Sequence, residues 1–358
     1  LLAVELTAGS AWALEPVVLM PGDTQVSPGL HYSIFEDVKG ELNFDKAREL
    51  LNQGEFSQSK TQTPSFGFTK SAYWFALELE KANAGDEDWL LQIAYPPLDI
   101  VSVWLITEGN VDHFATGDRA DFSTRPIDNR NFLFPLSFQQ NTSMLILIKV
   151  QQFEGDVLEL PSQLIKKSHL ARAELIPVFL DALYFGVLLV MVVYNLILFF
   201  FLRDHAYLSY SGYVLGTVIF MFSLHGWGAQ FIWGNNLFLQ QYIFPATTGV
   251  VVICLGIFTE RLLDFQKHQP LLKKRLRYSY LLVVGCMVFA PLISYSFFHQ
   301  SLLMLCIGFV SIFIITGVAQ WRRGSIAAKY YSYAFFSFMF GAIMFALNKA
   351  GFVPRNNI

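Results

Sequence analysis

Long apolar segments fill the second half of the 358-residue chain and constrain its fold more than any other feature. Residues 177–202 are almost entirely apolar, and a helix needs only roughly 20 residues to cross a bilayer core of about 30 Å. Five more apolar segments follow after short gaps, at residues 207–225, 243–260, 279–298, 302–321 and 330–348. The sequence therefore predicts an α-helical bundle of six spans over residues 177–348, surrounded by the lipid bilayer.

Basic residues indicate how this bundle is oriented. The loops after the first, third and fifth spans contain ten Lys and Arg residues, and the loops after the second and fourth spans contain none. Because cytoplasmic loops are enriched in Lys and Arg, the N-terminal part of the chain is predicted to lie on the periplasmic side. The ten residues are Arg203, Arg261, Lys267, Lys273, Lys274, Arg275, Arg277, Arg322, Arg323 and Lys329.

The number of spans raises a difficulty at the C-terminus. Six spans would return the chain to the periplasmic side, where Lys349 and Arg355 would lie on the side that lacks basic residues. A seventh span beyond Ile358 would remove this difficulty. We therefore expect residues 349–358 to form a periplasmic loop before a missing seventh span, in a sequence truncated at both ends.

The first half of the chain has the composition of an exported, water-soluble domain. Residues 1–175 contain 13 Lys and Arg against 24 Asp and Glu, whereas residues 176–358 contain 12 against 4. Residues 1–13 end in Ala11-Trp12-Ala13, a small-x-small pattern typical of signal peptidase sites, and are predicted to be a signal peptide remnant. The three cysteines all fall in the apolar half, so the exported domain is predicted to fold without disulfides.

Short alternating segments predict that residues 14–168 form an all-β sandwich. In residues 73–80, Tyr73 and Phe75 fall on one face of the expected strand, while Trp74 falls on the other. One helix is expected at residues 41–53, and residues 169–176 are expected to connect the domain to the membrane. The other predicted strands are 16–20, 31–35, 89–95, 100–106, 132–138 and 143–152.

Several segments together resemble one protein family. FGFTKSAYWFALEL, WLLQIAYPPLDIVSVWL and GDRADFSTRPIDNRNFLFPL resemble the type-2 extracellular domain of bacterial seven-transmembrane receptors with diverse intracellular signalling modules (7TMR-DISM). The segments that begin ALYFGVLLVMVVYN and HGWGAQFIW resemble the start of that family's membrane region. The resemblance implies a jelly-roll domain related to carbohydrate-binding modules, and seven spans followed by a cytoplasmic output module.

The resemblance also implies a ligand site in the exported domain. Aromatic rings can stack on sugar rings, and Arg, Asp and Asn can bind hydroxyl or carboxylate groups. Trp74 and Trp104 fall opposite the regular apolar residues, so they are predicted to be either exposed or part of a second core. Aromatic residues of a sandwich often belong to its core, and a loop arginine often holds its loop. The predicted ligand-binding residues are Tyr73, Trp74, Trp104, Arg125, Asp128, Arg130 and Asn131.

Few polar residues interrupt the predicted spans. Asp181 and Asn195 lie in the first span and Asn348 lies near the end of the sixth. Ionisable residues inside a membrane commonly have functional roles. Asp181, however, is expected in the first turn of its helix, where a negative charge is favourable, so it can be a cap or a ligand or proton site.

Taken with these patterns, the resemblance implies a receptor in a bacterial inner membrane that senses a periplasmic small molecule, carbohydrate or partner protein, and that can form a homodimer. By resemblance, the missing output module would be a diguanylate cyclase or a histidine kinase. A transporter or channel with a solute-binding cap, or a membrane-anchored carbohydrate-binding module, remain alternatives. The residues present contain no phosphate-binding glycine loop, nucleophile–base pair or metal-ligand spacing, so no enzyme, cofactor, metal or nucleic-acid partner is expected.

Overall fold

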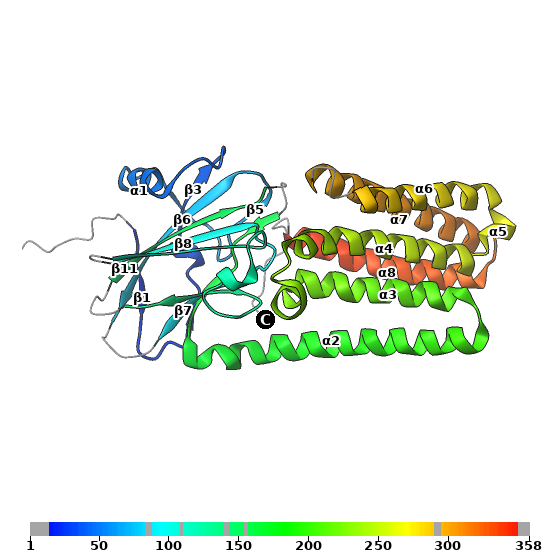
Figure 1. Cartoon of the computed structure of the whole chain (residues 1–358), viewed down its shortest axis with the longest axis horizontal. Coiled ribbons are helices and arrows are strands. Elements are labelled where there is room, and N and C mark those ends of the chain that lie inside the picture. Colours follow the sequence, from blue (N-terminus) through cyan, green and yellow to red (C-terminus); the bar gives the residue numbers. More distant parts are fainter. Residues whose placement is uncertain are drawn as a thin grey trace, which may run out of the picture. The chain divides into compact units, whose positions relative to one another are not determined.

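A computed structural model describes residues 14–82, 88–107, 110–138, 143–153, 157–289 and 295–349. The chain divides into two compact units, residues 1–172 and 173–358. The first unit consists mainly of strands and the second of helices (Figure 1). This confirms the predicted class, a β-sandwich followed by a helical bundle. The predicted signal peptide remnant at residues 1–13 and most of the predicted loop at 349–358 lie outside the described residues.

A seven-stranded sheet forms one layer of the sandwich. Its strands are hydrogen-bonded in the order β4-β3-β6-β11-β8-β9, and β1 pairs in parallel with the far end of β6. The longest strand, β6, pairs with β11 over nine residues from Ala72 to Glu80. The strands are β1 (Val17–Leu19), β3 (Ser33–Asp37), β4 (Ser57–Gln58), β6 (Ala72–Lys81), β8 (Ile100–Thr107), β9 (Asn110–Thr116) and β11 (Ser143–Gln151).

A four-stranded sheet forms the opposite layer. Its order is β10-β7-β13-β2, and a separate pair of short strands, β12 and β5, completes the domain. The strands are β2 (Gln25–Val26), β5 (Ser65–Phe68), β7 (Trp89–Ile93), β10 (Phe132–Leu136), β12 (Val157–Glu159) and β13 (Ser162–Lys166).

The main core lies between the two sheets. Tyr73, Phe75, Leu77 and Leu79 point into it from β6, as the alternation of that strand predicts. Ile146 and Ile148 of β11 and Phe132 and Phe134 of β10 are fully buried in the same core. Tyr32 donates a hydrogen bond to Ser162 Oγ across 3.0 Å, and its burial raises the pKa of its hydroxyl.

A second core covers the outer face of the large sheet. Helix α1 (Phe44–Asn52) packs Ala47 and Leu51 against Trp74, Ala76 and Leu147. The side chain of Asn43 caps the helix by accepting a hydrogen bond from the Lys46 amide at 3.0 Å. Strand β6 is therefore buried on both faces around this cluster, which explains why Trp74 and Ala76 on its outward face are also apolar.

The predicted strands are all present, but several observed strands were not predicted. Strands β2, β4, β5 and β12 have only two to four residues, too few to show an alternating pattern. Strand β9 lies at the edge of its sheet and is largely exposed, so its sequence NVDHFAT is mostly polar. Because β9 was not predicted, His113, which lies on this strand and stacks on Trp104, was not identified from the sequence.

The described residues of the second unit form six long helices. Four of the described helical segments are long and apolar enough to cross a membrane: Lys167–Leu202, His205–Leu224, Leu237–Leu262 and Met304–Arg322. A short π-helix, η3 (Ala229–Trp233), and a short helix, α5 (Phe265–His268), lie between longer ones. The long helices are α2 (Lys167–Leu202), α3 (His205–Leu224), α4 (Leu237–Leu262), α6 (Pro270–Phe289), α7 (Tyr295–Arg322) and α8 (Ile326–Lys349).

Each long helix begins before the span that the hydropathy pattern predicts, and the difference is largest for α2 and α6. Helix α2 includes residues 169–176, which were expected to form a connector, so this stretch is helical. Helix α6 starts at Pro270 and therefore includes the basic residues Lys273 to Arg277, which were expected in a loop. Hydropathy marks where a helix becomes apolar, whereas the helical backbone continues into its polar flanks.

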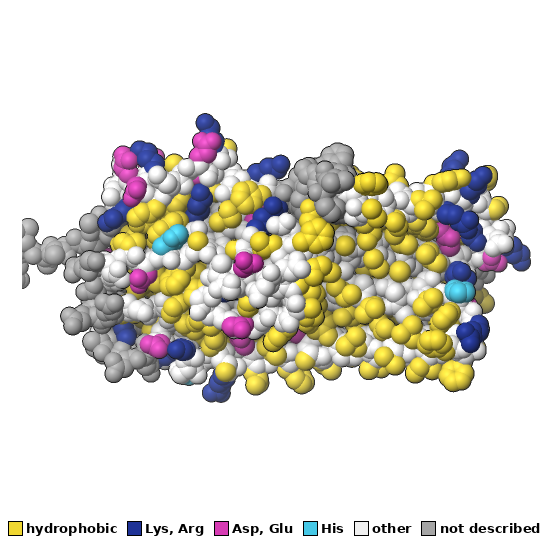
Figure 2. All heavy atoms as spheres, viewed as in Figure 1, with side chains coloured by type: hydrophobic (Ala, Val, Ile, Leu, Met, Phe, Trp, Pro, Cys, Tyr) yellow, Lys and Arg dark blue, Asp and Glu magenta, His cyan; other side chains and the backbone are white. Residues whose placement is uncertain are grey.

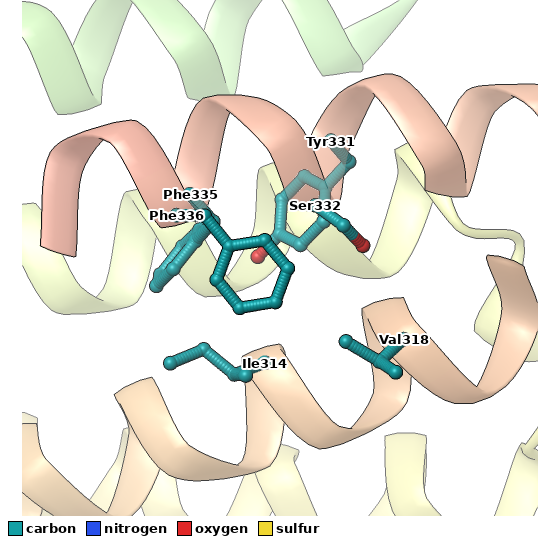
Figure 3. Close-up of a pocket in the computed structure, with 6 residues that line it drawn as sticks. All are labelled: Ile314, Val318, Tyr331, Ser332, Phe335 and Phe336. Atoms are coloured by element: carbon teal, nitrogen blue, oxygen red, sulfur yellow. The ribbon is translucent and has the colours of Figure 1, made fainter. Parts of the chain in front are cut away.

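Close helix contacts in the bundle depend on small residues. A side chain at Gly256 of α4 would place its Cβ 2.2 Å from the hydroxyl of Tyr280 on α6, which instead donates a hydrogen bond to Glu260 at 2.8 Å. Thr259 of α4 and Tyr331 of α8 share a hydrogen bond of 3.1 Å. Figure 3 shows a recess between α7 and α8 lined by Tyr331 and five other side chains, with no room for a water molecule.

Candidate functional site

Two predicted site residues lie side by side on the outer face of the large sheet. Trp74 of β6 and Trp104 of β8 stack with their ring centroids 5.3 Å apart and their planes at 20°. They belong to different strands separated by β11, so the sheet register brings them together. Trp74 is fully buried and Trp104 is half-buried. Of the two predicted alternatives, exposure or a second core, Trp74 belongs to a second core on the outer face of the sheet, and Trp104 packs against that core.

Further rings pack against Trp104. Phe44, the first residue of α1, stacks on it at 5.4 Å, and His113, its direct neighbour on β9, stacks on it at 4.6 Å with planes 8° apart. His113 is the exposed ring of this aromatic cluster, and its partial burial lowers the pKa of its imidazole. A ligand that approaches this cluster would therefore meet His113 and the accessible part of Trp104.

A half-buried lysine holds the rim of the aromatic cluster. Lys149 of β11 donates hydrogen bonds of 3.1 Å to the carbonyl oxygens of Gly40 and Leu42, and its ammonium group lies 5.4 Å from the Trp74 ring centroid. Burial lowers the pKa of Lys149, while the charge of nearby Asp37 opposes this shift. Asp37 also accepts hydrogen bonds from the amides of Gly40 and Leu42, at 2.9 and 2.8 Å.

Gly40 allows this turn to form. Its φ of +69° lies in the left-handed region that glycine adopts readily. Any side chain there would also meet the amide of Gln151. The turn between β3 and α1 is therefore fixed from both sides, by Asp37 through the backbone amides and by Lys149 through the carbonyls.

The predicted basic residues belong to a different place, the loop before β10. Arg125 is buried and donates hydrogen bonds from one terminal nitrogen to the carbonyls of Asn129 and Arg130, at 2.9 and 2.7 Å. Its guanidinium lies 4.6 Å from the centroid of Phe122 and 4.3 Å from that of Phe132. Burial lowers the pKa of Arg125 to about 10, so the group stays charged at neutral pH. In this structure Arg125 holds its own loop.

The neighbouring predicted residues share this loop. Arg130 and Asn131 are buried, and the backbone amide of Asn131 donates a 2.8 Å hydrogen bond to the side-chain oxygen of Asn129. Asp128 is exposed. Tyr73 lies apart from the loop residues in sequence and points into the main core, where its ring stacks on Phe66 at 3.8 Å.

The seven predicted residues thus fall into three groups rather than one pocket. Tyr73 is in the main core, Trp74 and Trp104 are in the aromatic cluster, and the other four are in the loop before β10. Sequence reasoning missed Phe44, His113 and Lys149, which complete the aromatic cluster. Recognising β9 as the edge partner of β8 would have placed His113 opposite Trp104.

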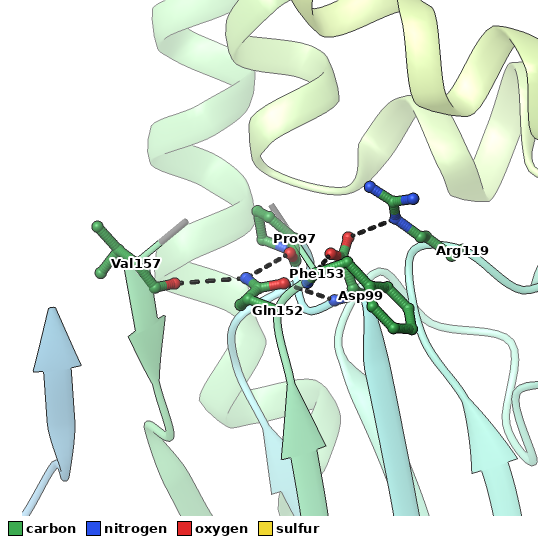
Figure 4. Close-up of polar contacts among 6 residues, drawn as sticks. All are labelled: Pro97, Asp99, Arg119, Gln152, Phe153 and Val157. Atoms are coloured by element: carbon green, nitrogen blue, oxygen red, sulfur yellow. Dashed lines mark hydrogen bonds and ion pairs between the residues drawn. The ribbon is translucent and has the colours of Figure 1, made fainter. Parts of the chain in front are cut away.

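A polar network fixes the loops at one end of the strands (Figure 4). Gln152 accepts a hydrogen bond from the Asp99 amide at 2.9 Å and donates to the carbonyls of Pro97 and Val157. The Asp99 carboxylate accepts from the Phe153 amide at 2.8 Å and pairs with Arg119 at 3.2 Å. These contacts join the segments that follow β7, β9 and β11, and they account for the buried polar side chains at this end.

A second polar cluster lies in the helical unit. Asp181 of α2 contacts His225 Nδ1 at 3.0 Å and accepts a hydrogen bond from Trp227 Nε1 at 2.9 Å. Both partners lie just beyond the end of α3, in the HGWGAQFIW segment. The expected position of Asp181 in a first helical turn is wrong, because α2 begins at Lys167 and Asp181 lies well inside it. Its role here is to join α2 to the segment after α3.

The two units and their contents define a class of protein: a membrane protein with an extracellular β-sandwich domain. The family described as 7TMR-DISM extracellular 2 matches residues 29–165, and the family described as 7TM diverse intracellular signalling matches residues 178–358. The chain belongs to the 7TMR-DISM family. No curated protein matches the chain.

Proposed function

We propose that this chain is a bacterial inner-membrane receptor whose periplasmic sandwich binds a ligand and whose helical bundle passes the signal to a cytoplasmic output domain. The observation that carries the proposal is the order of the two units: a domain with its own core precedes a bundle that matches a family described by intracellular signalling. A diguanylate cyclase or a histidine kinase is the output class that the family resemblance favours.

The aromatic cluster is the part of the sandwich best suited to bind a carbohydrate-like ligand. His113 is exposed and offers an aromatic face on which the apolar face of a sugar ring can stack, and the half-buried Trp104 lies directly beside it. Phe44, Trp74 and Lys149 hold these rings in place from behind and from the side. A preorganised platform of this kind binds with little loss of side-chain entropy.

The bundle has features of a signalling element rather than a transport pathway. Its polar contacts join helices in pairs: Asp181 links α2 to the segment after α3, and Glu260 links α4 to α6. Such contacts can differ between two arrangements of the bundle, which is what a ligand must bias in order to signal. The α7–α8 recess in Figure 3 is apolar and too small for water.

Binding can be tested on the full chain in lipid nanodiscs with cellotetraose and maltotetraose as probes. One of these sugars is expected to quench or shift tryptophan fluorescence. His113→Ala is expected to weaken the affinity measured from that response at least tenfold. Lys167→Gln, a change at an exposed residue that follows β13 of the other sheet, serves as the control. Uptake of either sugar into proteoliposomes would instead favour a transporter.

A further inference from the structure

Helix α6 presents a continuous exposed stripe along one side. Leu271, Tyr278, Leu281 and Leu282 are 74%, 63%, 64% and 53% exposed, although all are apolar or aromatic. Tyr278 follows Leu271 by seven residues, and Leu281 and Leu282 follow Tyr278 by three and four, which are spacings that place side chains on one helix face. The opposite face of α6, with Leu276, Tyr280 and Val283, is buried against neighbouring helices.

The chemistry of this stripe changes along the helix axis. Near its start the stripe carries Lys274 and Arg275, then Tyr278, and then the apolar residues Leu281, Leu282 and Phe289. At 1.5 Å per residue, Lys274 lies about 6 Å before Tyr278 and Phe289 lies about 16 Å beyond it. Charged, aromatic and apolar zones in this order match the headgroup, interface and acyl layers of a lipid leaflet.

The start of α6 carries four basic residues, and the helix itself contains no acidic residue to balance them. Lys274, Arg275 and Arg277 are exposed and form no ion pair within the part of the chain that the structure describes. Glu260 of α4 accepts a hydrogen bond from Tyr280 and interacts electrostatically with Lys273 and Arg277, whereas no acidic partner is seen for Lys274 and Arg275 among the described residues. Figure 2 shows Lys and Arg side chains gathered at the end of the helical unit where Figure 1 places α5.

We propose that the exposed face of α6 is a binding site for an anionic phospholipid. Its phosphate would lie against Lys274, Arg275 and Arg277, where arginine can form two parallel hydrogen bonds to phosphate oxygens. Tyr278 would lie at the level of the glycerol, and one acyl chain would run along Leu281 and Leu282 towards Phe289. Binding would therefore depend both on the charge of the headgroup and on the acyl chain.

Native mass spectrometry of the delipidated full chain can test this site by titration with phosphatidylglycerol and phosphatidylcholine of identical acyl chains. Phosphatidylglycerol is expected to bind at least tenfold more tightly, and the K274Q/R275Q/R277Q variant is expected to lose that preference. The K274R/R277K variant keeps the charges and should retain it. The matched control R322Q/R323Q/K329Q removes three charges from the α7–α8 segment and should also retain it.

Three results would overturn the proposal. The first is equal binding of the two lipids. The second is an equal loss of preference in the control variant, which would show a general effect of net charge. The third is displacement of phosphatidylglycerol by millimolar inorganic phosphate, since the apolar stripe would then contribute nothing. Matching elution profiles and melting temperatures for all variants would establish that each one folds.

Discussion

Trp74 and Trp104 stack on the outer face of the large sheet with their ring centroids 5.3 Å apart. The contact joins β6 to β8 across β11 and is covered from one side by Phe44 of α1. Because Trp74 is fully buried while Trp104 is half-buried, the pair connects the second core to the surface. Trp74 is therefore a structural residue, whereas Trp104 and its neighbour His113 are the rings that a ligand can reach.

Replacement of Trp74 by alanine tests its structural role. Trp74→Ala is expected to destabilise the sandwich by about 3–5 kcal/mol, because it opens a cavity beneath α1. Trp74→Phe should cost clearly less, since it keeps an aromatic ring and removes an indole N–H that has no hydrogen-bond partner among the described residues. Hydrogen exchange of the β6 and β11 amides in the full chain measures both effects.

His113→Ala is the matched control for this pair, because it removes an exposed ring from the same cluster. It should change the opening free energy of β6 by less than about 1 kcal/mol. If His113→Ala destabilised the sheet as much as Trp74→Ala, the division between a buried support and an accessible ring would be wrong.

Glu78 makes the stability of the sandwich depend on pH. This carboxyl is buried, and one of its oxygens has no hydrogen-bond partner among the described residues. Its burial raises its pKa, and the negative charge of Glu80 adds a smaller shift in the same direction. The folded state therefore holds the proton more tightly than the unfolded state, so stability falls as pH rises from the ordinary pKa of a glutamate to the raised one. Glu78→Gln should then stabilise the sandwich by about 1 kcal/mol at neutral pH.

The gain from Glu78→Gln should shrink as pH falls through this window, because the wild-type carboxyl becomes neutral as well. Urea unfolding followed by hydrogen exchange at several pH values measures this trend. Glu41→Gln, at an exposed position, should show no such change. A gain that is constant with pH would contradict the assignment to Glu78 ionisation.

Asp181→Asn tests the link between α2 and the segment after α3. The asparagine keeps one acceptor oxygen for Trp227 but replaces the other by an NH2 donor without charge, so the contact to His225 loses its charge-assisted part at a cost of about 1–2 kcal/mol. Faster hydrogen exchange in residues 225–233 is the expected sign. Asp264→Asn removes an exposed charge from the same bundle at a left-handed position that asparagine tolerates, and it should leave this exchange unchanged.

Gly256→Ala tests the packing of α4 on α6. The new Cβ would lie 2.2 Å from the Tyr280 hydroxyl, so either the helices separate or the hydrogen bond to Glu260 breaks. Overpacking of this kind costs about 1–3 kcal/mol. Gly285→Ala in α6 has open space around its Cβ and should not lower the melting temperature in nanodiscs. Equal melting temperatures for the two variants would contradict the close contact.

Much of the fold follows from periodicity in the sequence. Strand β6 shows a clear alternation, and the apolar segments identify the helices, because both signals are local. The limits of α6 were misjudged because charged residues continue a helix that hydropathy alone assigns to a loop. Edge strand β9 was missed because its exposed residues carry no apolar pattern.

The candidate site was harder to predict than the fold. Trp74 and Trp104 were singled out correctly as outward residues, but the contact between them depends on the register of β6, β11 and β8. Phe44 and Lys149 come from a helix and a central strand distant in the sequence. Arg125 looked like a ligand-binding residue by type, and only the loop geometry shows that it bonds to Asn129 and Arg130.

The most direct test of the receptor proposal is hydrogen exchange of the full chain in nanodiscs with and without cellotetraose or maltotetraose. One sugar is expected to protect β8 and β9 around Trp104 and His113, and also to change exchange in the helical unit, first at residues 225–233. Protection confined to the sandwich would contradict signalling through the bundle, and no change with either sugar would contradict the proposed carbohydrate site.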